Sequence, residues 1–311
     1  MTRVSAIIPV YNGAATIAEA IDSALAQSYP SLEVIVVNDG STDGTAELLR
    51  RYAERVKVID RPNGGIAAAR NTGVAAASGE FLAFLDSDDI WGPMMIERTV
   101  AALDRNPDCV LAYTNCAVID SDGHDLDSAL IGAGVDHAPT LDEMLSRLWP
   151  IMPSAVVMRC VAFDACGGFS EEFRSYGFED VIFWLRVREQ GEFCYLPECL
   201  VKWRFSLYPN PLKTGWRKPE ARITFDRILR ERYGVSADRL LAARARANRS
   251  ILGYIGLRAL RDGDRASARE AFRRALQIHP LRVKNILRYL KTYLPLGMVR
   301  VLSGRTRDIR H

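Results

Sequence analysis

The sequence predicts an α/β fold, with a mostly parallel sheet covered by helices on both faces and an all-helical C-terminal extension. Short apolar runs alternate with helical segments over the first 90 or so residues, and such connections place strands parallel. From about residue 220 the chain has helical periodicity throughout. We therefore expect an α/β domain at 1–219, divided into halves at 1–115 and 116–219, and a helical extension at 220–311.

Periodicity and turn residues assign the individual elements. The expected strands cover 4–10, 32–37, 56–59, 81–85, 109–114 and 153–158, and the expected helices cover 14–27, 46–53, 66–77 and 94–106. Thr16 and Glu19 have the spacing of a capping box for the first helix. Residues 121–139 are rich in Asp, Gly and Ser, and we interpret them as a mobile loop.

Composition is that of a soluble globular protein, with 48% apolar and 25% charged residues. The start has no signal-peptide pattern, and no apolar stretch approaches the roughly 18 residues of a spanning helix. We therefore expect a cytoplasmic protein. The six cysteines form no CxxC or zinc-like spacing, so reduced thiols in and around the core are expected. His124 and His137 are interpreted as surface residues.

Charge is distributed unevenly along the chain. Residues 241–311 hold 17 Lys and Arg against 4 Asp and Glu, whereas the remainder holds 24 against 34. Residues 281–302 are both amphipathic and basic, a pattern typical of helices on anionic membranes, although a helix covering the catalytic body would show it too. Residues 254–280 resemble one tetratricopeptide-like helix pair, and a single pair cannot form a solenoid.

The most informative stretch is 81–89, an apolar run that ends in Asp86, Asp88 and Asp89. Unpaired carboxylates are costly in a core, but they suit a cleft that binds Mg²⁺ or Mn²⁺ and phosphate. The alternative is an acidic cap on a helix beginning at Ile90. Asp39 follows another expected strand, and the carboxyl ends of parallel strands meet at one rim. Two acidic strand ends at one rim favour the ligand site over the cap.

Four motifs resemble those of family 2 glycosyltransferases, whose fold is called GT-A. They are Ser5–Asn12, Val37–Thr45, Ala69–Arg70–Asn71 and the DxD-like Asp86–Ser87–Asp88. The resemblance implies that Asp39 contacts the base of a nucleoside diphosphate sugar. It implies that Asp86 and Asp88 meet the ribose and a divalent metal. The other implied donor-binding residues are Pro9, Tyr11, Asn12, Arg70 and Ser87.

A second part of the resemblance lies in the other half of the chain. Gly167–Gly168–Phe169 is followed by Phe178–Glu179–Asp180, which opens an amphipathic helix. Acidic residues stabilise a helix's first turn without any catalytic role, by about 0.3–1 kcal/mol. In the family, however, the residue equivalent to Asp180 is the proposed general base. Glu179, Trp203 and Arg204 are expected on the acceptor side.

One position departs from the family pattern. Ser206 stands where many members carry a histidine that joins the metal or diphosphate, so Asn210, Lys213 or water are alternative third ligands. The QxxRW segment and membrane helices of processive synthases are missing from the sequence, which favours transfer of a single sugar.

The sequence thus predicts an inverting, metal-assisted glycosyltransferase that uses Mn²⁺ or Mg²⁺ and a nucleoside diphosphate sugar, most simply a UDP-sugar. The acceptor is a glycan or lipid-linked hydroxyl in cell-surface polysaccharide biosynthesis, at the inner face of the membrane. Nucleic acid is not an expected partner, because aromatic residues do not interleave with the basic ones. A nucleotidyltransferase and a non-catalytic scaffold are the alternatives. The former usually opens with a Gly-rich, Arg-containing segment that residues 4–13 do not supply.

Overall fold

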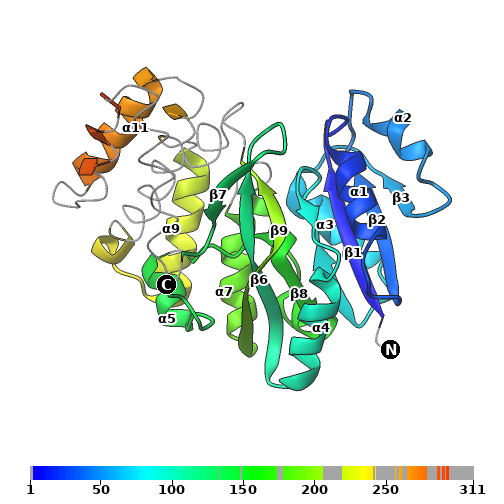
Figure 1. The fold of residues 1–311 in the computed structure, drawn as a ribbon. Coiled ribbons are helices and arrows are strands. Elements are labelled where there is room, and N and C mark those ends of the chain that lie inside the picture. Colours follow the sequence, from blue (N-terminus) through cyan, green and yellow to red (C-terminus); the bar gives the residue numbers. More distant parts are fainter. Residues whose placement is uncertain are drawn as a thin grey trace, which may run out of the picture. The chain divides into compact units, whose positions relative to one another are not determined.

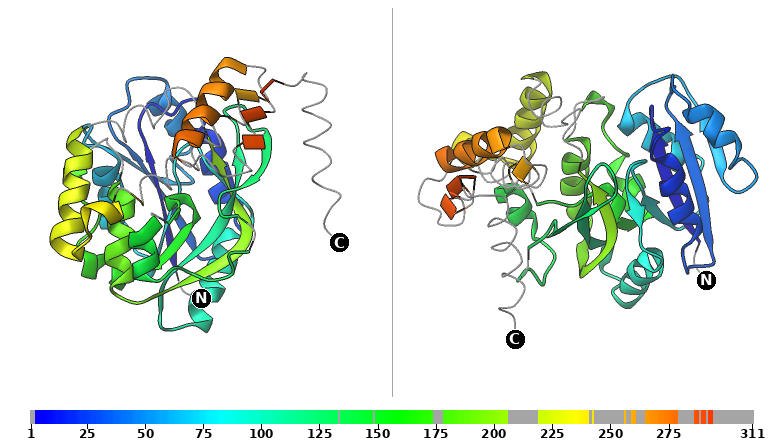
Figure 2. Two further views of the ribbon diagram at one scale, coloured as in Figure 1. Left: turned by 90° about the vertical axis from the view of Figure 1, so that its left-hand side faces the viewer. Right: turned by 45° about the horizontal axis from the view of Figure 1, so that its top comes forward.

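The computed structural model describes residues 3–132, 134–147, 149–173, 178–205, 219–240 and 265–278. It also describes six single residues or pairs of the C-terminal region, namely 242, 256, 259–260, 286–287, 289–290 and 292–293. The chain forms two compact units. The first comprises Met1–Leu145 and Trp149–Val235, and the second comprises Ser146–Leu148 and Ser236–His311. The boundary near residue 219 remains a prediction, and the compact unit in the structure extends through 219–235. Figures 1 and 2 show the ribbon in three orientations.

The first unit is built on one nine-stranded sheet with the order β3-β2-β1-β4-β8-β6-β9-β5, and β7 pairs with β6 outside this path. The strands are β1 Val4–Val10, β2 Leu32–Asn38, β3 Lys57–Asp60, β4 Phe81–Phe84, β5 Ile90–Trp91, β6 Cys109–Ile119, β7 Asp125–Ala129, β8 Val156–Arg159 and β9 Glu192–Arg204. β3, β2, β1 and β4 are mutually parallel, and β6 is parallel to β9. β8 runs antiparallel to both β4 and β6 and joins the two parallel groups.

Helices cover both faces of this sheet. They are α1 Ile17–Leu25, α2 Thr45–Arg50, α3 Ile66–Ala75, α4 Met95–Arg105, α5 Leu141–Arg147, α6 Cys160–Cys166, α7 Glu179–Arg188 and α9 Pro219–Tyr233. α1 and α4 bury one core cluster with alternate residues of β1, and α1 lies beside β1 in Figure 1. α3 packs on the other face, where Gly73 permits close approach because a Cβ there would lie 2.4 Å from Ile7.

The second face continues as an aromatic cluster around Phe84. Phe84 of β4 lies edge-on to Phe169, with 5.3 Å between the ring centroids, and Phe169 lies 4.2 Å from Phe183 of α7. Such aromatic pairs add about 0.5–1.5 kcal/mol beyond their buried area. α9 joins the first unit through Phe225, which stacks on Phe178 just before α7. The start of α7 is therefore fixed by aromatic packing from two directions.

Two local expectations were wrong, and the helix that the alternative to the ligand site placed at Ile90 is not formed. Ile90–Trp91 is a strand, because it pairs with Val201 and Lys202 of β9. The segment 121–139 contains β7, which pairs with β6. The expected strand at 153–158 begins as the 3-10 turn η1, Pro153–Ala155, because Pro153 cannot donate to a sheet ladder.

The predicted capping box at the start of α1 is also not formed. Thr16 makes no side-chain capping bond to α1. Glu19 instead accepts a hydrogen bond from Nη2 of Arg204 at 2.5 Å, a contact across 185 residues of sequence.

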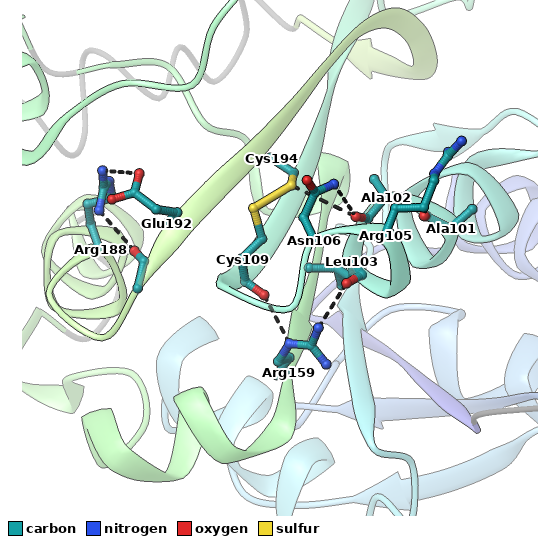
Figure 3. The surroundings of a disulfide bond; sticks show 11 residues. Ala101, Ala102, Leu103, Arg105, Asn106, Cys109, Arg159, Arg188, Glu192 and Cys194 are labelled. Atoms are coloured by element: carbon teal, nitrogen blue, oxygen red, sulfur yellow. Dashed lines mark hydrogen bonds and ion pairs between the residues drawn. A yellow bond between two sulfur atoms is a disulfide. The ribbon is translucent and has the colours of Figure 1, made fainter.

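A disulfide joins Cys109 to Cys194, contrary to the expectation of reduced cysteines (Figure 3). The two residues lie where the adjacent parallel strands β6 and β9 begin, with their Cα atoms 6.1 Å apart. Arg159 donates to the carbonyl oxygens of Cys109 and Leu103, so it ties β6 to the end of α4 beside the disulfide. Sequence spacing gave no sign of this pair because 85 positions separate the two cysteines. The other four cysteines are free.

In the second unit, the described residues centre on α11, Arg265–Ile278. Ala268 and Phe272 of α11 pack with Ala259 and Leu260, and Tyr289 lies against this cluster. Within the part of the chain that the structure describes, no helix is long and apolar enough to cross a membrane.

Candidate functional site

The expected rim of polar residues exists at the carboxyl ends of the parallel strands. Asn38 ends β2 in register with Val10 at the end of β1, and Leu85 continues beyond β4 by donating to the carbonyl of Ile7. Asp39 and Asp86 therefore follow strands on either side of β1. This confirms that the two acidic strand ends lie at one edge of the sheet.

The loop after β2 is held by its own polar side chains. Asn12, at φ +52°, accepts the N–H of Thr42 through Oδ1 and donates its own N–H to Ser41. Gly40 has φ +75°, and a Cβ there would lie 2.8 Å from the main-chain nitrogen of Asn63, so only glycine fits. Hydrogen bonds within the chain and the glycine turn therefore both support this conformation of the loop. Tyr11 is half exposed beside it, and Pro9 is buried in β1.

Asp39 is buried, with only 2% of its surface exposed, and both carboxylate oxygens have protein donors. It accepts the N–H groups of Gly64 and Gly65 at 3.0 and 2.8 Å, and Arg61 lies 3.0 Å away. In this structure Asp39 therefore joins the end of β2 to the turn before α3.

Arg70 of α3 connects the two halves of the site. Its Nη2 donates to Asp86 at 2.7 Å and its Nη1 donates to Glu179 at 2.9 Å, although the side chain is only 1% exposed. The guanidinium also lies over the ring of Phe169, 5.2 Å from the centroid. An arginine fork is the side chain best suited to hold two carboxylates at once. Arg70 therefore fixes the DxD-like turn relative to the start of α7.

Asn71, the next residue of α3, holds the loop that precedes α7. Its Nδ2 donates to the carbonyl of Phe169 and its Oδ1 accepts the N–H of Phe169, both at 2.9 Å. Gly168, at φ +75°, leaves room for this contact, since a Cβ there would lie 2.8 Å from Oδ1. The Ala69–Arg70–Asn71 motif thus joins α3 to the turn after β4, to the loop at Phe169 and to the start of α7.

The three carboxylates after β4 have different surroundings. Asp86 is partly exposed and bound to Arg70, Asp88 is exposed, and Asp89 is buried. Among the residues that the structure describes, no side chain donates to the carboxylate of Asp88. Asp88 reaches solvent, yet enclosure by surrounding protein, followed by repulsion from Asp86, raises its pKa to about 6. Ser87 is partly exposed between them.

These residues fit a divalent cation. Asp86 and Asp88 offer hard oxygen donors, which Mg²⁺ and Mn²⁺ prefer. A cation would also relieve the repulsion that raises the pKa of Asp88. Asp86 and Asp88 are the residues that would hold the metal if the prediction from the sequence is right. Ser206, Asn210 and Lys213 lie outside the described residues.

A different carboxylate group also brings ligand atoms together. One atom each from Asp120, Asp122 and His124 can lie within 4.8 Å of the others. Oδ1 of Asp120 already accepts the N–H groups of Asp122 and His124, which is the bonding of a tight turn. These hydrogen bonds stabilise the turn between β6 and β7. The turn is distant in sequence from the DxD-like motif.

Asp180 lies in the first turn of α7 and is partly exposed. Desolvation by the surrounding protein, followed by repulsion from Glu179, raises its pKa to about 7, while Arg70 opposes the rise. A carboxylate with a pKa near neutrality is suited to accept and release a proton. His124 and His137 are exposed, as expected.

The other residues expected on the acceptor side have structural contacts. Trp203 is partly buried against the core, with its ring 5.4 Å from that of Phe205. Arg204 is buried and donates through Nε to the carbonyl of Asp88 at 2.8 Å. Sequence reasoning missed Ser154, whose hydroxyl bonds to both Asp86 and Asp89. No local signal marks it, because the serine lies 65 residues beyond Asp89.

Three comparisons identify the kind of protein. A model of "Glycosyl transferase family 2" matches residues 5–131. RP339 of Rickettsia prowazekii, named an uncharacterized glycosyltransferase, is 32% identical over 208 residues, which are 65% of this chain and 63% of RP339. TuaG of Bacillus subtilis, whose name provisionally assigns it to teichuronic acid biosynthesis, is 33% identical over 210 residues, which are 65% of this chain and 78% of TuaG.

The fold has counterparts among solved structures. The chain superposes on residues 1–349 of TarS from S. aureus with a TM-score of 0.55 and 20% identity, covering 93% of this chain and 90% of that one. TarS has also been solved with UDP and with UDP-GlcNAc. The chain spans 63% of the length of the Rickettsia prowazekii and Rickettsia typhi relatives and 38% of two others. With its match to the family model and its 33% identity across most of TuaG, the chain belongs to glycosyltransferase family 2, and its first unit has the GT-A fold.

Proposed function

We propose that this chain transfers one sugar, with inversion, from a nucleoside diphosphate sugar to a hydroxyl of a glycan or lipid-linked acceptor. The observation that carries the proposal is the pair of bonds made by Arg70. Through them, the carboxylates that would meet the donor and the helix that carries Asp180 belong to one charge network at the sheet rim. The complexes of TarS with UDP and UDP-GlcNAc support a UDP-sugar as donor.

In this proposal Pro9, Tyr11, Asn12 and Ser87 line the donor pocket, and Asp39 shapes the base site through its bonds to the turn at 64–65. Asp86 and Asp88 would hold Mn²⁺ or Mg²⁺. When bound, the metal neutralises negative charge on the departing diphosphate. Arg70 keeps Asp86 oriented toward that position, because its second bond to Glu179 fixes the guanidinium.

Asp180 is the general base. It removes the proton of the acceptor hydroxyl while that oxygen forms a bond to the anomeric carbon. The bond from the anomeric carbon to the diphosphate oxygen breaks with its electron pair, and the diphosphate leaves from the opposite face. One displacement inverts the anomeric centre. General base catalysis of this kind contributes typically about 10²–10⁴-fold.

The acceptor and location are part of the same proposal. TuaG supports cell-surface polysaccharide biosynthesis as the setting. Leu287, Leu290 and Tyr293 are each more than half exposed, in a region with 17 Lys and Arg against 4 Asp and Glu. Apolar side chains among basic ones suit an anionic membrane surface. We place the enzyme at the inner face of the membrane, where a lipid-linked acceptor would be within reach.

The test incubates purified protein with Mn²⁺ and UDP-, GDP- and dTDP-sugars and measures release of nucleoside diphosphate. We expect release from one donor, with loss after chelation. Asp180→Asn should retain donor binding and lose about 10²–10⁴-fold in acceptor-dependent turnover. Asp164→Asn, at an exposed position of α6, is the matched control and should match wild type. Absence of both binding and release would favour the scaffold alternative, and formation of the sugar nucleotide from a nucleoside triphosphate would favour the nucleotidyltransferase.

Membrane contact has a separate test. The protein should float with vesicles that contain phosphatidylglycerol and remain in solution with phosphatidylcholine vesicles. Replacing Leu287 and Leu290 with serine should abolish flotation without lowering turnover of a soluble acceptor. Equal flotation of the double variant would contradict this contact.

A further inference from the structure

The third carboxylate of the DxD-like turn, Asp89, is bonded entirely within the protein. It is 2% exposed, unlike Asp86 and Asp88. Its Oδ2 accepts the hydroxyl of Ser154 at 2.5 Å, and its Oδ1 accepts the main-chain N–H of Arg204 at 2.8 Å. Both oxygens therefore have partners on other elements of the sheet, and the carboxylate joins the turn to η1 and β9.

Ser154 holds both ends of that turn with a single hydroxyl. While it donates to Asp89, its Oγ accepts the main-chain N–H of Asp86 at 3.0 Å. The residue is fully buried, and its carbonyl accepts Nε1 of Trp91 at 2.6 Å. Because these bonds come from a buried, rigid segment, the ends of the turn cannot move independently.

Arg204 holds the middle of the turn. Its Nε donates to the carbonyl of Asp88 at 2.8 Å. Its other donors bind the carbonyl of Ser121 at 3.0 Å and Glu19 at 2.5 Å. The guanidinium is thus anchored on the turn that follows β6 and on α1, and it holds the main-chain carbonyl of Asp88.

We propose that Ser154, Asp89 and Arg204 are positioning residues that set the separation of the Asp86 and Asp88 carboxylates for a divalent cation and a diphosphate. They act through the turn and do not touch substrate. The two neighbouring carboxylates repel each other, so without these bonds the turn would let them move apart. Binding a metal would then require free energy to bring the two carboxylates back together. This inference rests on the proposed function, and it gives Arg204 a role different from acceptor binding.

The test compares two serine variants that each remove a buried hydroxyl with the same two kinds of partner. Ser154→Ala removes a fully buried hydroxyl that donates to a carboxylate and accepts a main-chain N–H. Ser5 has the same arrangement at the opposite end of the sheet, since its hydroxyl is fully buried, donates to Glu33 at 2.5 Å and accepts the N–H of Gly79 at 2.8 Å. Ser5→Ala is therefore a matched control for the loss of such a hydroxyl.

Binding of Mn²⁺ in the presence of UDP is measured from the electron paramagnetic resonance signal of free Mn²⁺, together with thermal unfolding. Both serine variants should unfold at lower temperature by similar amounts. Ser154→Ala alone should weaken Mn²⁺ binding by about tenfold or more, the loss typical of a hydrogen bond to a charged group. The Mn²⁺ concentration for half-maximal turnover should rise in parallel, with kcat at saturating Mn²⁺ reduced much less.

Asp89→Asn repeats the test with the shape of the side chain retained, in case Ser154→Ala does not fold. It should weaken Mn²⁺ binding in the same direction. Wild-type affinity in the folded Asp89→Asn or Ser154→Ala variant, or an equal loss in Ser5→Ala, would overturn the positioning role while the proposed function stands. Failure of the wild-type protein to bind Mn²⁺ with UDP would overturn the proposed function and this inference together.

Discussion

Arg70 and Glu179 form an ion pair of 2.9 Å between residues that are 109 positions apart in the sequence. The side chain of Arg70 is 1% exposed and that of Glu179 is 6% exposed. A buried pair of this kind is expensive to break, because one charge is then left without a partner. The second bond of Arg70, to Asp86, extends the pair into the site.

Arg70→Ala should destabilise the protein by about 3–5 kcal/mol, since it leaves Glu179 and Asp86 without their cation. Arg70→Lys should retain part of that stability but lose turnover, because one ammonium cannot hold both carboxylates as a fork does. Arg50→Ala is the control, since its pair with Glu47 is on the surface and contributes about 0–1 kcal/mol. Chemical denaturation measures the stabilities. Equal effects of Arg70→Ala and Arg50→Ala would contradict a structural role for the buried pair.

The pH dependence of turnover should report on Asp180. Its pKa is raised to about 7, and it must be deprotonated to act as a base, so kcat/KM should rise with pH and level off above about 7. Glu179→Gln removes the negative charge that raises this pKa, so the acid limb should move to lower pH. A pH–rate profile in both proteins checks the direction of the shift. An unchanged or higher apparent pKa in Glu179→Gln would exclude Asp180 as the titrating group.

Substitutions in the two carboxylate clusters, Asp86 with Asp88 and Asp120 with Asp122, should affect the dependence on metal differently. Asp88→Ala should abolish Mn²⁺-dependent release of the diphosphate, because it removes an exposed oxygen ligand with no side-chain donor of its own among the described residues. Asp122→Ala, in the β6–β7 turn, should leave metal dependence unchanged. Turnover measured against Mn²⁺ concentration distinguishes them. If Asp122→Ala lost the dependence on Mn²⁺ and Asp88→Ala retained it, the metal site would lie in the β6–β7 turn instead.

Glycine is required at one position of the loop after β2. Gly40→Ala should cost about 1–2 kcal/mol for the left-handed conformation alone, and more because the new Cβ would meet the main chain of Asn63. Gly44→Ala in the same loop should be tolerated, because its nearest neighbour would be 3.8 Å away at a negative φ. Thermal unfolding and UDP affinity provide the comparison. A Gly40→Ala protein with wild-type stability would mean that the loop adopts another conformation.

The disulfide determines how many cysteine thiols of the chain can react with a thiol reagent. Denatured protein kept free of reductant should react with thiol reagent at four positions per chain, and at six after reduction. In the chain-entropy model, closing a loop of this length stabilises the fold by about 4–5 kcal/mol, so reduction should lower the unfolding temperature. Cys199→Ser, at an exposed free cysteine, is the control and should lower only the count. Six reactive thiols before reduction would show that the bond is not formed.

The sheet and its rim could be predicted because their signals are local. An apolar run of four to seven residues followed by Asp39 or Asp86 shows both the strand and the end at which the site lies. Alternating strands and helices then leave few topologies. The positions of Arg70 and Asp180 followed from motifs, and the geometry adds that the two are coupled through Glu179.

Contacts between distant segments could not be predicted. Glu19 has the spacing of a capping residue, but it binds Arg204, because a buried guanidinium nearby offers a stronger partner than an exposed amide. Ile90–Trp91 follows acidic residues as a helix often does, yet β9 supplies a strand to pair with. In both cases a contact with a segment distant in sequence determines the local structure. Such contacts cannot be predicted from about ten neighbouring residues.

The disulfide also changes what a single cut in the backbone can do. Cys109 and Cys194 enclose β7, α5, β8, α6 and α7, and therefore the chain from the middle of the sheet to the residues around Asp180. A protease that cleaves once anywhere between these cysteines would leave two fragments that migrate as one molecule until a reductant is added. Gels run with and without reductant would then map which exposed connection is cut first, while the nicked protein remains in one piece.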